Sequence, residues 1–451
     1  MKFKYILFLY FFFFNLTNSL ITLQIYSKTS KQENDYSIEK LQENNYKDIY
    51  SIRFYTNISI GNPEQKIPFL INFHSPLLYI SNPSINGTYI HQNSNSFKFK
   101  NNQPEILNMY FDIIDTFYLC SDIFNLNNVN YTFKFILGLT SKNNSFIDNY
   151  IGLSPRKQFI DKLYPFLSQI KNNENIISNV FVINFDKSKN FGKIIFGGYP
   201  HDYEPKKYKI EDFRIIGEKD TFFQYEYGWE LQFNYISFIN YLYDENEKVI
   251  DEKIVFKYHN KTLFRVNIDA NYISLNKDLS IQVEKIIENL YKNNCYKINK
   301  NLSNNYNYIC RNKIDITKFP SLILSLEPIN FLFELDYTDL FLKKNNYYFI
   351  LLEFSDSYDK GEIGFPFLSK YNLVFHESEN IIGFYIKTYD NGEYILFIQI
   401  LIISIFINLL FIFFYLRRYF KRKNLKNIDY SYINDKKTQI DYLNPIKSNI
   451  Y

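Results

Sequence analysis

Phe54-Tyr-Thr-Asn-Ile-Ser-Ile-Gly61 and the nearby Ile71-Asn-Phe-His-Ser75 are the segments that decide the fold of this chain. Both belong to a pattern that continues from about residue 50 to residue 388, in which short β-branched and aromatic runs are broken by Asn, Asp, Gly and Pro. Runs of this kind are typical of strands joined by turns. Helical periodicity is confined to stretches such as Leu279 to Lys292. The sequence therefore predicts an all-β body.

The composition places few limits on function. With 451 residues, the chain is long enough for one large or two medium domains. Asn, Lys, Ile, Phe and Tyr are in excess and Ala270 is the only alanine, which indicates AT-rich codon usage rather than a structural demand. The formal net charge of +4 is small for this length. Nothing in it suggests a nucleic-acid partner.

The two ends of the chain indicate a membrane protein. Residues 1–19 have two lysines, an apolar core and small polar residues, as in a secretory signal peptide. Residues 394–416 form an apolar run of about the ~20 residues that span a bilayer. Six cations follow it, so we expect residues 417–451 to be a cytoplasmic tail and the body to be luminal or extracellular. These cations are Arg417, Arg418, Lys421, Arg422, Lys423 and Lys426.

Two other interpretations of these ends stay open. The C-terminal run could be a buried core helix, and the N-terminal run could be an uncleaved anchor.

A secretory or cell-surface location permits disulfides and N-glycans. Cys295 and Cys310 are close enough in sequence to close a short loop, and Cys120 is left over. Outside the predicted signal peptide, six sequons are compatible with secretion, although several would arise by chance in a chain so rich in asparagine: Asn57, Asn86, Asn130, Asn143, Asn260 and Asn301.

Many ordered landmarks resemble those of the pepsin-like aspartic proteases. The opening strand ends at Gly61, a flap hairpin with a tyrosine at Tyr110 follows, and Gly192-Lys-Ile-Ile-Phe-Gly-Gly198 matches the close of the first lobe. Tyr227-Gly-Trp-Glu-Leu-Gln-Phe233 resembles the strand that opens the second lobe, and Ile363-Gly-Phe-Pro-Phe367 resembles the closing block. Any one match is weak, but a dozen in order are strong.

The resemblance implies two β-rich lobes with a central cleft, and a C-terminal transmembrane helix in addition. We expect an N-terminal lobe at residues 49–205 and a C-terminal lobe at residues 206–388. Residues 20–48 would be a short pro-segment or a flexible tail. The resemblance also implies that Cys295 pairs with Cys310, and that no cofactor or metal is needed.

The catalytic signatures depart from the family pattern. Where the family has its first catalytic aspartate, this chain has Asn72, followed by Phe73 and His74 in place of Thr and Gly. The resemblance carries the second aspartate onto Asp269, with Ala270 after it. An aspartic protease needs two carboxyls that share a proton, and an amide cannot exchange a proton usefully. Half of the chemistry is therefore missing.

The sequence supports three hypotheses for function. The first is a type I membrane protein with impaired endopeptidase activity that binds an extended peptide or protein segment in its cleft. The second is an active aspartic endopeptidase that uses Asp269 in an acidic secretory compartment. The third is a glycosylated surface protein with a vestigial cleft. His74 is expected to be a turn residue near the cleft, because it lies two positions after the catalytic one.

Overall fold

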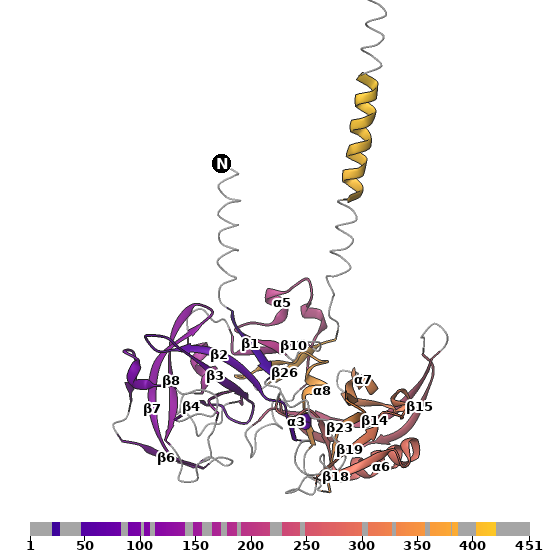
Figure 1. Cartoon of the computed structure of the whole chain (residues 1–451), viewed down its shortest axis with the longest axis horizontal. Coiled ribbons are helices and arrows are strands. Elements are labelled where there is room, and N and C mark those ends of the chain that lie inside the picture. The colour runs from indigo at the N-terminus through magenta and orange to yellow at the C-terminus, as the bar shows by residue number, and fades with distance from the viewer. Residues whose placement is uncertain are drawn as a thin grey trace, which may run out of the picture. The chain divides into compact units, whose positions relative to one another are not determined.

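The computed structural model describes sixteen segments of the chain: residues 20–27, 47–82, 89–100, 103–108, 113–139, 148–155, 165–172, 178–186, 191–216, 228–243, 249–299, 305–326, 331–356, 361–379, 381–386 and 403–420. The chain divides into a body, Met1–Lys387, and a tail, Thr388–Tyr451. The predicted signal peptide at residues 1–19 and the flap residue Tyr110 lie outside the described residues. Figure 1 shows the two units.

The largest sheet of the body has 14 strands. It joins the first half of the body to two strands close to its C-terminal end, β25 and β26. The strands are β1 (Ile21–Ser27), β2 (Phe54–Ile60), β3 (Gln65–Asn72), β4 (Leu78–Asn82), β5 (Lys98–Phe99), β6 (Glu105–Asn108), β7 (Ile113–Leu126), β8 (Val129–Leu139), β9 (Tyr150–Gly152), β10 (Val180–Asp186), β11 (Phe191–Phe196), β12 (Phe213–Ile215), β25 (Val374–His376) and β26 (Ile381–Tyr385).

Two smaller sheets come from the second half of the body (Figure 1). One has eight strands: β13 (Glu230–Phe233), β16 (Thr262–Val266), β17 (Ile273–Leu275), β18 (Cys295–Asn299), β19 (Tyr306–Arg311), β22 (Phe341–Lys344), β23 (Tyr347–Phe354) and β24 (Gly361–Ile363). The other has four: β14 (Tyr235–Tyr243), β15 (Val249–Tyr258), β20 (Ser321–Leu326) and β21 (Phe331–Leu335). The predicted all-β fold is confirmed.

In the described part of the body, the α-helices are short apart from α6. They are α3 (Lys47–Tyr50), α4 (Phe166–Lys171), α5 (Pro200–Tyr203), α6 (Lys277–Tyr291), α7 (Tyr337–Leu340) and α8 (Phe365–Leu368). The Asn276 side chain caps α6 by accepting the backbone N–H of Leu279 at 3.1 Å. Val283 and Ile287, four residues apart, lie on its buried face. This is the helix that the sequence predicts around Leu279 to Lys292.

Strand β1 is a full member of the largest sheet, although the sequence assigns residues 20–48 to a pro-segment or tail. It pairs antiparallel with β11 along its length and with β2 at Tyr26 and Ser27. Its side chains alternate, with Ile21, Leu23 and Ile25 buried. Residues 28–46 lie outside the described segments. Whether this region is a pro-segment stays a prediction.

A disulfide joins Cys295 in β18 to Cys310 in β19, which confirms the implied pairing. The two cysteines are direct partners in the antiparallel ladder between these strands. Cys120 in β7 is free and fully buried, and burial raises the pKa of its thiol to about 12. Such a thiol stays protonated and packs as a small apolar side chain.

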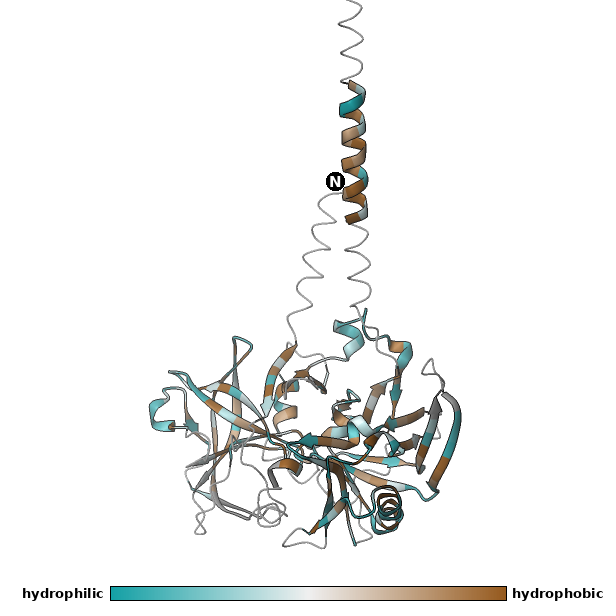
Figure 2. Cartoon of the chain, turned by 45° about the vertical axis from the view of Figure 1, so that its right-hand side comes forward, coloured by the Kyte–Doolittle hydropathy of each residue, from teal (hydrophilic) through white to brown (hydrophobic). Residues whose placement is uncertain are grey.

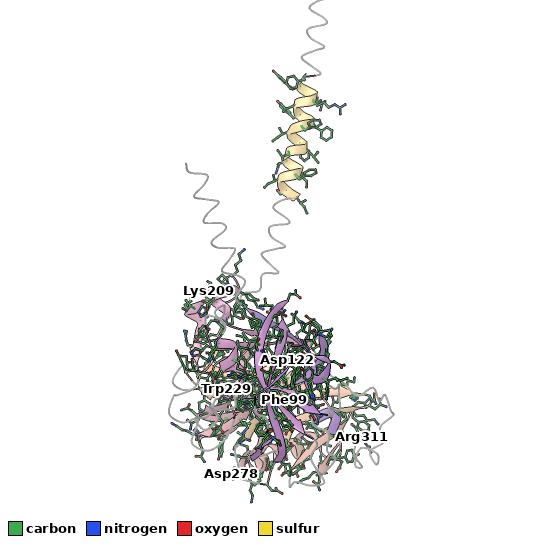
Figure 3. The ribbon with its side chains drawn as sticks, turned by 90° about the vertical axis from the view of Figure 1, so that its left-hand side faces the viewer. Phe99, Asp122, Lys209, Trp229, Asp278 and Arg311 are labelled. Atoms are coloured by element: carbon green, nitrogen blue, oxygen red, sulfur yellow. A yellow bond between two sulfur atoms is a disulfide. The ribbon has the colours of Figure 1, made fainter. Side chains whose placement is uncertain are left out.

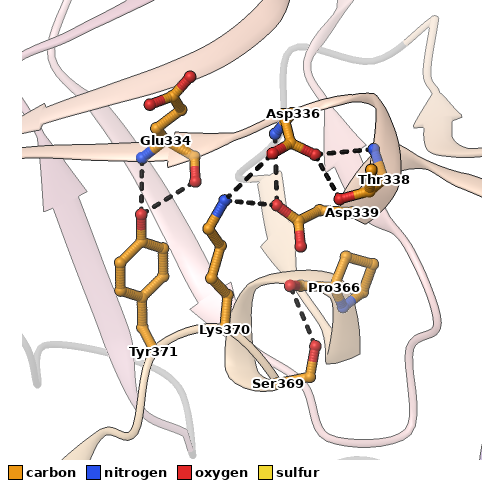
Figure 4. A network of polar contacts seen from close by, with 8 residues as sticks. All are labelled: Glu334, Asp336, Thr338, Asp339, Pro366, Ser369, Lys370 and Tyr371. Atoms are coloured by element: carbon orange, nitrogen blue, oxygen red, sulfur yellow. Dashed lines mark hydrogen bonds and ion pairs between the residues drawn. The ribbon is translucent and has the colours of Figure 1, made fainter. Parts of the chain in front are cut away.

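A polar network anchors α8 to β21 and α7 (Figure 4). Lys370, just after α8, approaches the carboxylates of Asp339 at 2.6 Å and Asp336 at 3.8 Å. The Tyr371 hydroxyl accepts the backbone N–H of Glu334 at 2.8 Å and donates to its carbonyl at 2.9 Å. These contacts hold the segment after β24 against the four-stranded sheet.

In the tail, Ile403–Phe420 is a helix that is long and apolar enough to cross a membrane. Most of it is coloured as hydrophobic in Figure 2. The predicted span, residues 394–416, begins outside the described residues, and the helix continues four residues beyond its predicted end. Arg417 and Arg418 therefore belong to the last turn of the helix.

Candidate active site

The turn after β3 carries Asn72, the last residue of that strand. Its side-chain oxygen, Oδ1, accepts the backbone N–H of His74 at 2.7 Å and that of Ser75 at 3.2 Å. The amide oxygen therefore points back into its own turn and fixes the chain there.

The turn after β16 repeats this arrangement with Asn267. Its Oδ1 accepts the backbone N–H of Asp269, again two residues later, at 3.0 Å. The same oxygen lies 3.3 Å from Nε2 of His74. Because Oδ1 is an acceptor, Nε2 of His74 is the donor in this contact. The two turns, 195 residues apart, thus meet at Asn267 and His74.

The strand pairings around the two turns also match. β3 runs parallel to β9, with Asn72 opposite Gly152. β16 runs parallel to β24, with Val266 opposite Ile363, which brings Asn267 beside Gly364. The backbone N–H of Asn267 donates to the Ile363 carbonyl at 2.9 Å.

The two glycines approach the turns in the same way. A Cβ on Gly152 would lie 2.3 Å from the carbonyl oxygen of Ser75, and a Cβ on Gly364 would lie 2.1 Å from that of Ala270. Ser75 lies three residues after Asn72, and Ala270 lies three residues after Asn267. Only glycine allows such a close backbone approach. By pairing, hydrogen bonding and packing, Asn267 has the local arrangement of Asn72.

Asp269 does not have these contacts. Asp269 lies two residues after Asn267, just as His74 lies two residues after Asn72, so Asp269 corresponds to His74 and not to Asn72. The backbone N–H of Asn271, two residues after Asp269, donates to the carbonyl of Tyr50 at 3.0 Å instead of to the Asp269 carboxyl. The carboxyl oxygen Oδ1 of Asp269 is buried and has no hydrogen-bond partner among the described residues.

Burial raises the pKa of Asp269 to about 7. Removal from water is the main cause, because a carboxylate is disfavoured where water is excluded. The Arg53 guanidinium opposes this shift, whereas the charges of Glu362 and Asp148 add to it. The Arg53 guanidinium itself donates to Asp148 at 3.2 Å, and its side chain is 58 % exposed.

The segment before β2 lies along the turn after β16. The backbone N–H of Ile52 donates to the Asp269 carbonyl at 3.0 Å, and Ser51 forms a bridge with Ala270. Tyr50 is buried against Phe349 of β23, with ring centroids 6.3 Å apart. The segment that leads into β2 is therefore fixed on the turn after β16.

Comparison with protein-family profiles matches residues 53–385 to the Eukaryotic aspartyl protease family. The chain belongs to this aspartyl protease family. The match spans both turns and all of the sequence landmarks between them. No curated protein is similar enough to be matched.

Phe73 stands where the resemblance to the aspartyl protease family implies a threonine. Its ring is fully buried and packs edge-on against Phe181 at 6.1 Å and Phe375 at 5.4 Å. Trp229, which is buried (Figure 3), contacts both of these rings and donates its indole N–H to the Leu153 carbonyl at 2.7 Å. Phe73, Phe181, Phe375 and Trp229 thus form one buried aromatic cluster.

Asn267 is not among the candidate site residues that the sequence pattern predicts for this aspartyl protease family member. The signal was present, because Val266-Asn267-Ile268 repeats the apolar-Asn-apolar order of Ile71-Asn72-Phe73. The aspartate two residues later was the more obvious match. Glu362 is a second residue beside the two turns that the sequence pattern does not predict. It accepts the side-chain N–H of Asn267 at 3.1 Å and the hydroxyl of Tyr272 at 3.3 Å.

Proposed function

We propose that this chain is a peptide-binding member of the aspartyl protease family that lacks endopeptidase activity. The observation that carries the proposal is the matching arrangement of Asn72 and Asn267, each with its Oδ1 bonded to the N–H two residues later. We further propose that Asn267, rather than Asp269, occupies the second catalytic position. Both members of the catalytic pair would then be amides.

Two amides cannot carry out the reaction of the family. The ionised carboxyl must take a proton from water while its protonated partner donates one to the substrate carbonyl. An asparagine side chain offers a carbonyl oxygen and an NH₂ group, and neither exchanges a proton near neutral pH. Binding does not need the pair, because extended peptides are held largely by main-chain hydrogen bonds and side-chain pockets.

A working protease that uses Asp269 is the second candidate. It is favoured by the pKa of about 7 at this carboxyl, which would allow proton transfer near neutral pH. His74 contributes a second titratable group within the same cluster, at 3.3 Å from Asn267. This candidate lacks a proton-sharing partner for Asp269 among the described residues.

An assay of peptide cleavage separates these candidates. We expect the detergent-solubilised full chain to cleave a randomised fluorogenic peptide pool no faster between pH 3 and pH 8 than its Asp269→Ala variant. We also expect Asn72→Asp alone to give no gain, because its partner position would still be Asn267. A statine-type inhibitor should bind weakly to all three.

Either of two results would contradict this proposal. One is wild-type cleavage that Asp269→Ala abolishes. The other is an Asn72→Asp variant that gains roughly 10²-fold or more in rate, as a restored acid and base would provide. If the full chain bound no member of a fluorescein-labelled peptide pool, peptide binding would fail as well, and a surface protein with a vestigial cleft would be favoured.

We propose that the chain is a type I membrane protein of the secretory pathway. The apolar helix followed by cations, the disulfide and the apolar N-terminal run support this topology. Among the sequons in the described residues, Asn57, Asn130 and Asn260 are exposed. We expect glycosidase treatment of the chain from a eukaryotic secretory host to increase its gel mobility. Asn→Gln changes at these three positions should reduce that shift, and a chain that carries no glycan would count against luminal placement.

A further inference from the structure

The contacts that Asp269 makes within the chain leave one oxygen of its carboxyl group without a hydrogen-bond partner among the described residues. Its backbone is fixed on both sides, because its N–H donates to Asn267 and its carbonyl accepts from Ile52. Part of the residue remains exposed, yet Oδ1 is buried without a hydrogen-bond partner. A buried carboxyl oxygen of this kind is costly unless something donates to it. The fold thus holds a rigid acceptor that no described group satisfies.

The charged groups around Asp269 do not neutralise it. The Asp148 carboxylate, which acts on Asp269, holds the Arg53 guanidinium at 3.2 Å. The Glu362 carboxylate also acts on Asp269, and it accepts from Asn267 and Tyr272.

Arg265 of β16 pairs in register with Glu230 of β13 and with Glu362 of β24. The charges that act on Asp269 itself are the carboxylates of Asp148 and Glu362 and the guanidinium of Arg53. Three carboxyls, that of Asp269 included, are therefore matched by one guanidinium, and His74 is the only basic side chain on the two turns.

We propose that Asp269 is the anchoring carboxylate for a basic side chain, lysine or arginine, of the bound peptide. This inference rests on the proposed peptide binding and adds a specificity to it. A lysine ammonium or an arginine guanidinium supplies N–H donors and the missing positive charge to the unpartnered oxygen. Asp269 is only partly buried as a residue, so a basic side chain can approach its carboxyl group from solvent. The ligand class is thus an extended peptide with a central basic residue.

Labelled peptide pools test this specificity. Three fluorescein-labelled octapeptide pools would have Lys, norleucine or Glu fixed at a central position and the other positions randomised. We expect the full chain at pH 8 to bind the Lys pool roughly tenfold or more tighter than the norleucine pool, as a charge-assisted hydrogen bond provides. The preference should shrink below pH 7, because protonation removes the charge of Asp269.

Variants locate the effect. Asp269→Asn should bring the affinities for the Lys and norleucine pools to within about twofold, since a charge-assisted bond is replaced by a neutral one. Asp251→Asn, at an exposed position in β15, should leave the preference unchanged. Equal wild-type binding of the Lys and norleucine pools would overturn the basic-residue anchor while leaving peptide binding intact. Failure of every pool would overturn both, and a preference that persists in Asp269→Asn would move the anchor to another carboxyl.

Discussion

Replacement of Phe73 by alanine is expected to lower the free energy of unfolding by about 3–5 kcal/mol, the usual range for a buried aromatic ring. The ring is fully buried between Phe181 and Phe375, which come from strands β10 and β25. Its removal leaves a cavity in the aromatic cluster that includes Trp229. Because the chain has a single tryptophan, its fluorescence reports this cluster directly during unfolding by urea.

Two further variants interpret this measurement. Ile210→Ala removes an apolar side chain that is 70 % exposed, so it should change stability by less than about 0.5 kcal/mol. Phe73→Thr restores the hydroxyl of the family but should still destabilise the chain, because the matching residue of the second turn is the apolar Ile268. A Phe73→Thr variant as stable as the wild type would show that the aromatic cluster does not stabilise the chain.

Asp269→Asn is expected to remove a pH dependence of stability worth about 4 kcal/mol. The folded pKa of about 7 lies above the ordinary value of 3.8. Between these values the folded chain keeps a proton that the unfolded chain releases, so the stability of the wild type falls as the pH rises from about 4 to about 7. Each of the roughly three pH units between the two pKa values contributes about 1.36 kcal/mol.

The variant has no carboxyl to ionise at this position. Relative to the wild type, it should therefore gain stability as the pH rises and reach its full advantage above pH 7. Urea unfolding of both chains at pH 4, 6 and 8 measures the difference. In Asp251→Asn, which changes an exposed carboxyl, the free energy of unfolding should vary with pH as it does in the wild type. If the free energy of unfolding of Asp269→Asn also varied with pH as it does in the wild type, the Asp269 carboxyl would be solvated and the buried acceptor proposed above would not exist.

The sequence predicted the fold class because many landmarks occur in the order that the family requires. Glycines such as Gly152 and Gly364 were informative, since a side chain at either position would collide with a neighbouring turn. The disulfide also followed from the resemblance. The prediction for Asn72 depends on the landmarks on either side of it, which fix the alignment of this segment with the family pattern.

The arrangement of the second turn could not be read in the same way. It depends on the pairing of β16 with β24, which joins Val266 to Ile363 across almost a hundred residues. Without that register, Asp269 was the residue whose type fitted the motif. Strand β1 was missed for a related reason, because its partners β2 and β11 come much later in the chain. Tyr110 lies outside the described residues, so its role in a flap stays a prediction.

The pairing of β1 beside β2 and of β26 beside β12 has a mechanical consequence. The chain enters the largest sheet through Ile21–Ser27 and leaves it through Ile381–Tyr385, so tension on either end is applied to the same sheet. A pull on the tail would load the two short ladders of β26, with β12 and with β25, whereas a pull on the N-terminal end would load the longer ladder between β1 and β11. We therefore expect β26 to separate from its neighbouring strands at a lower force than β1.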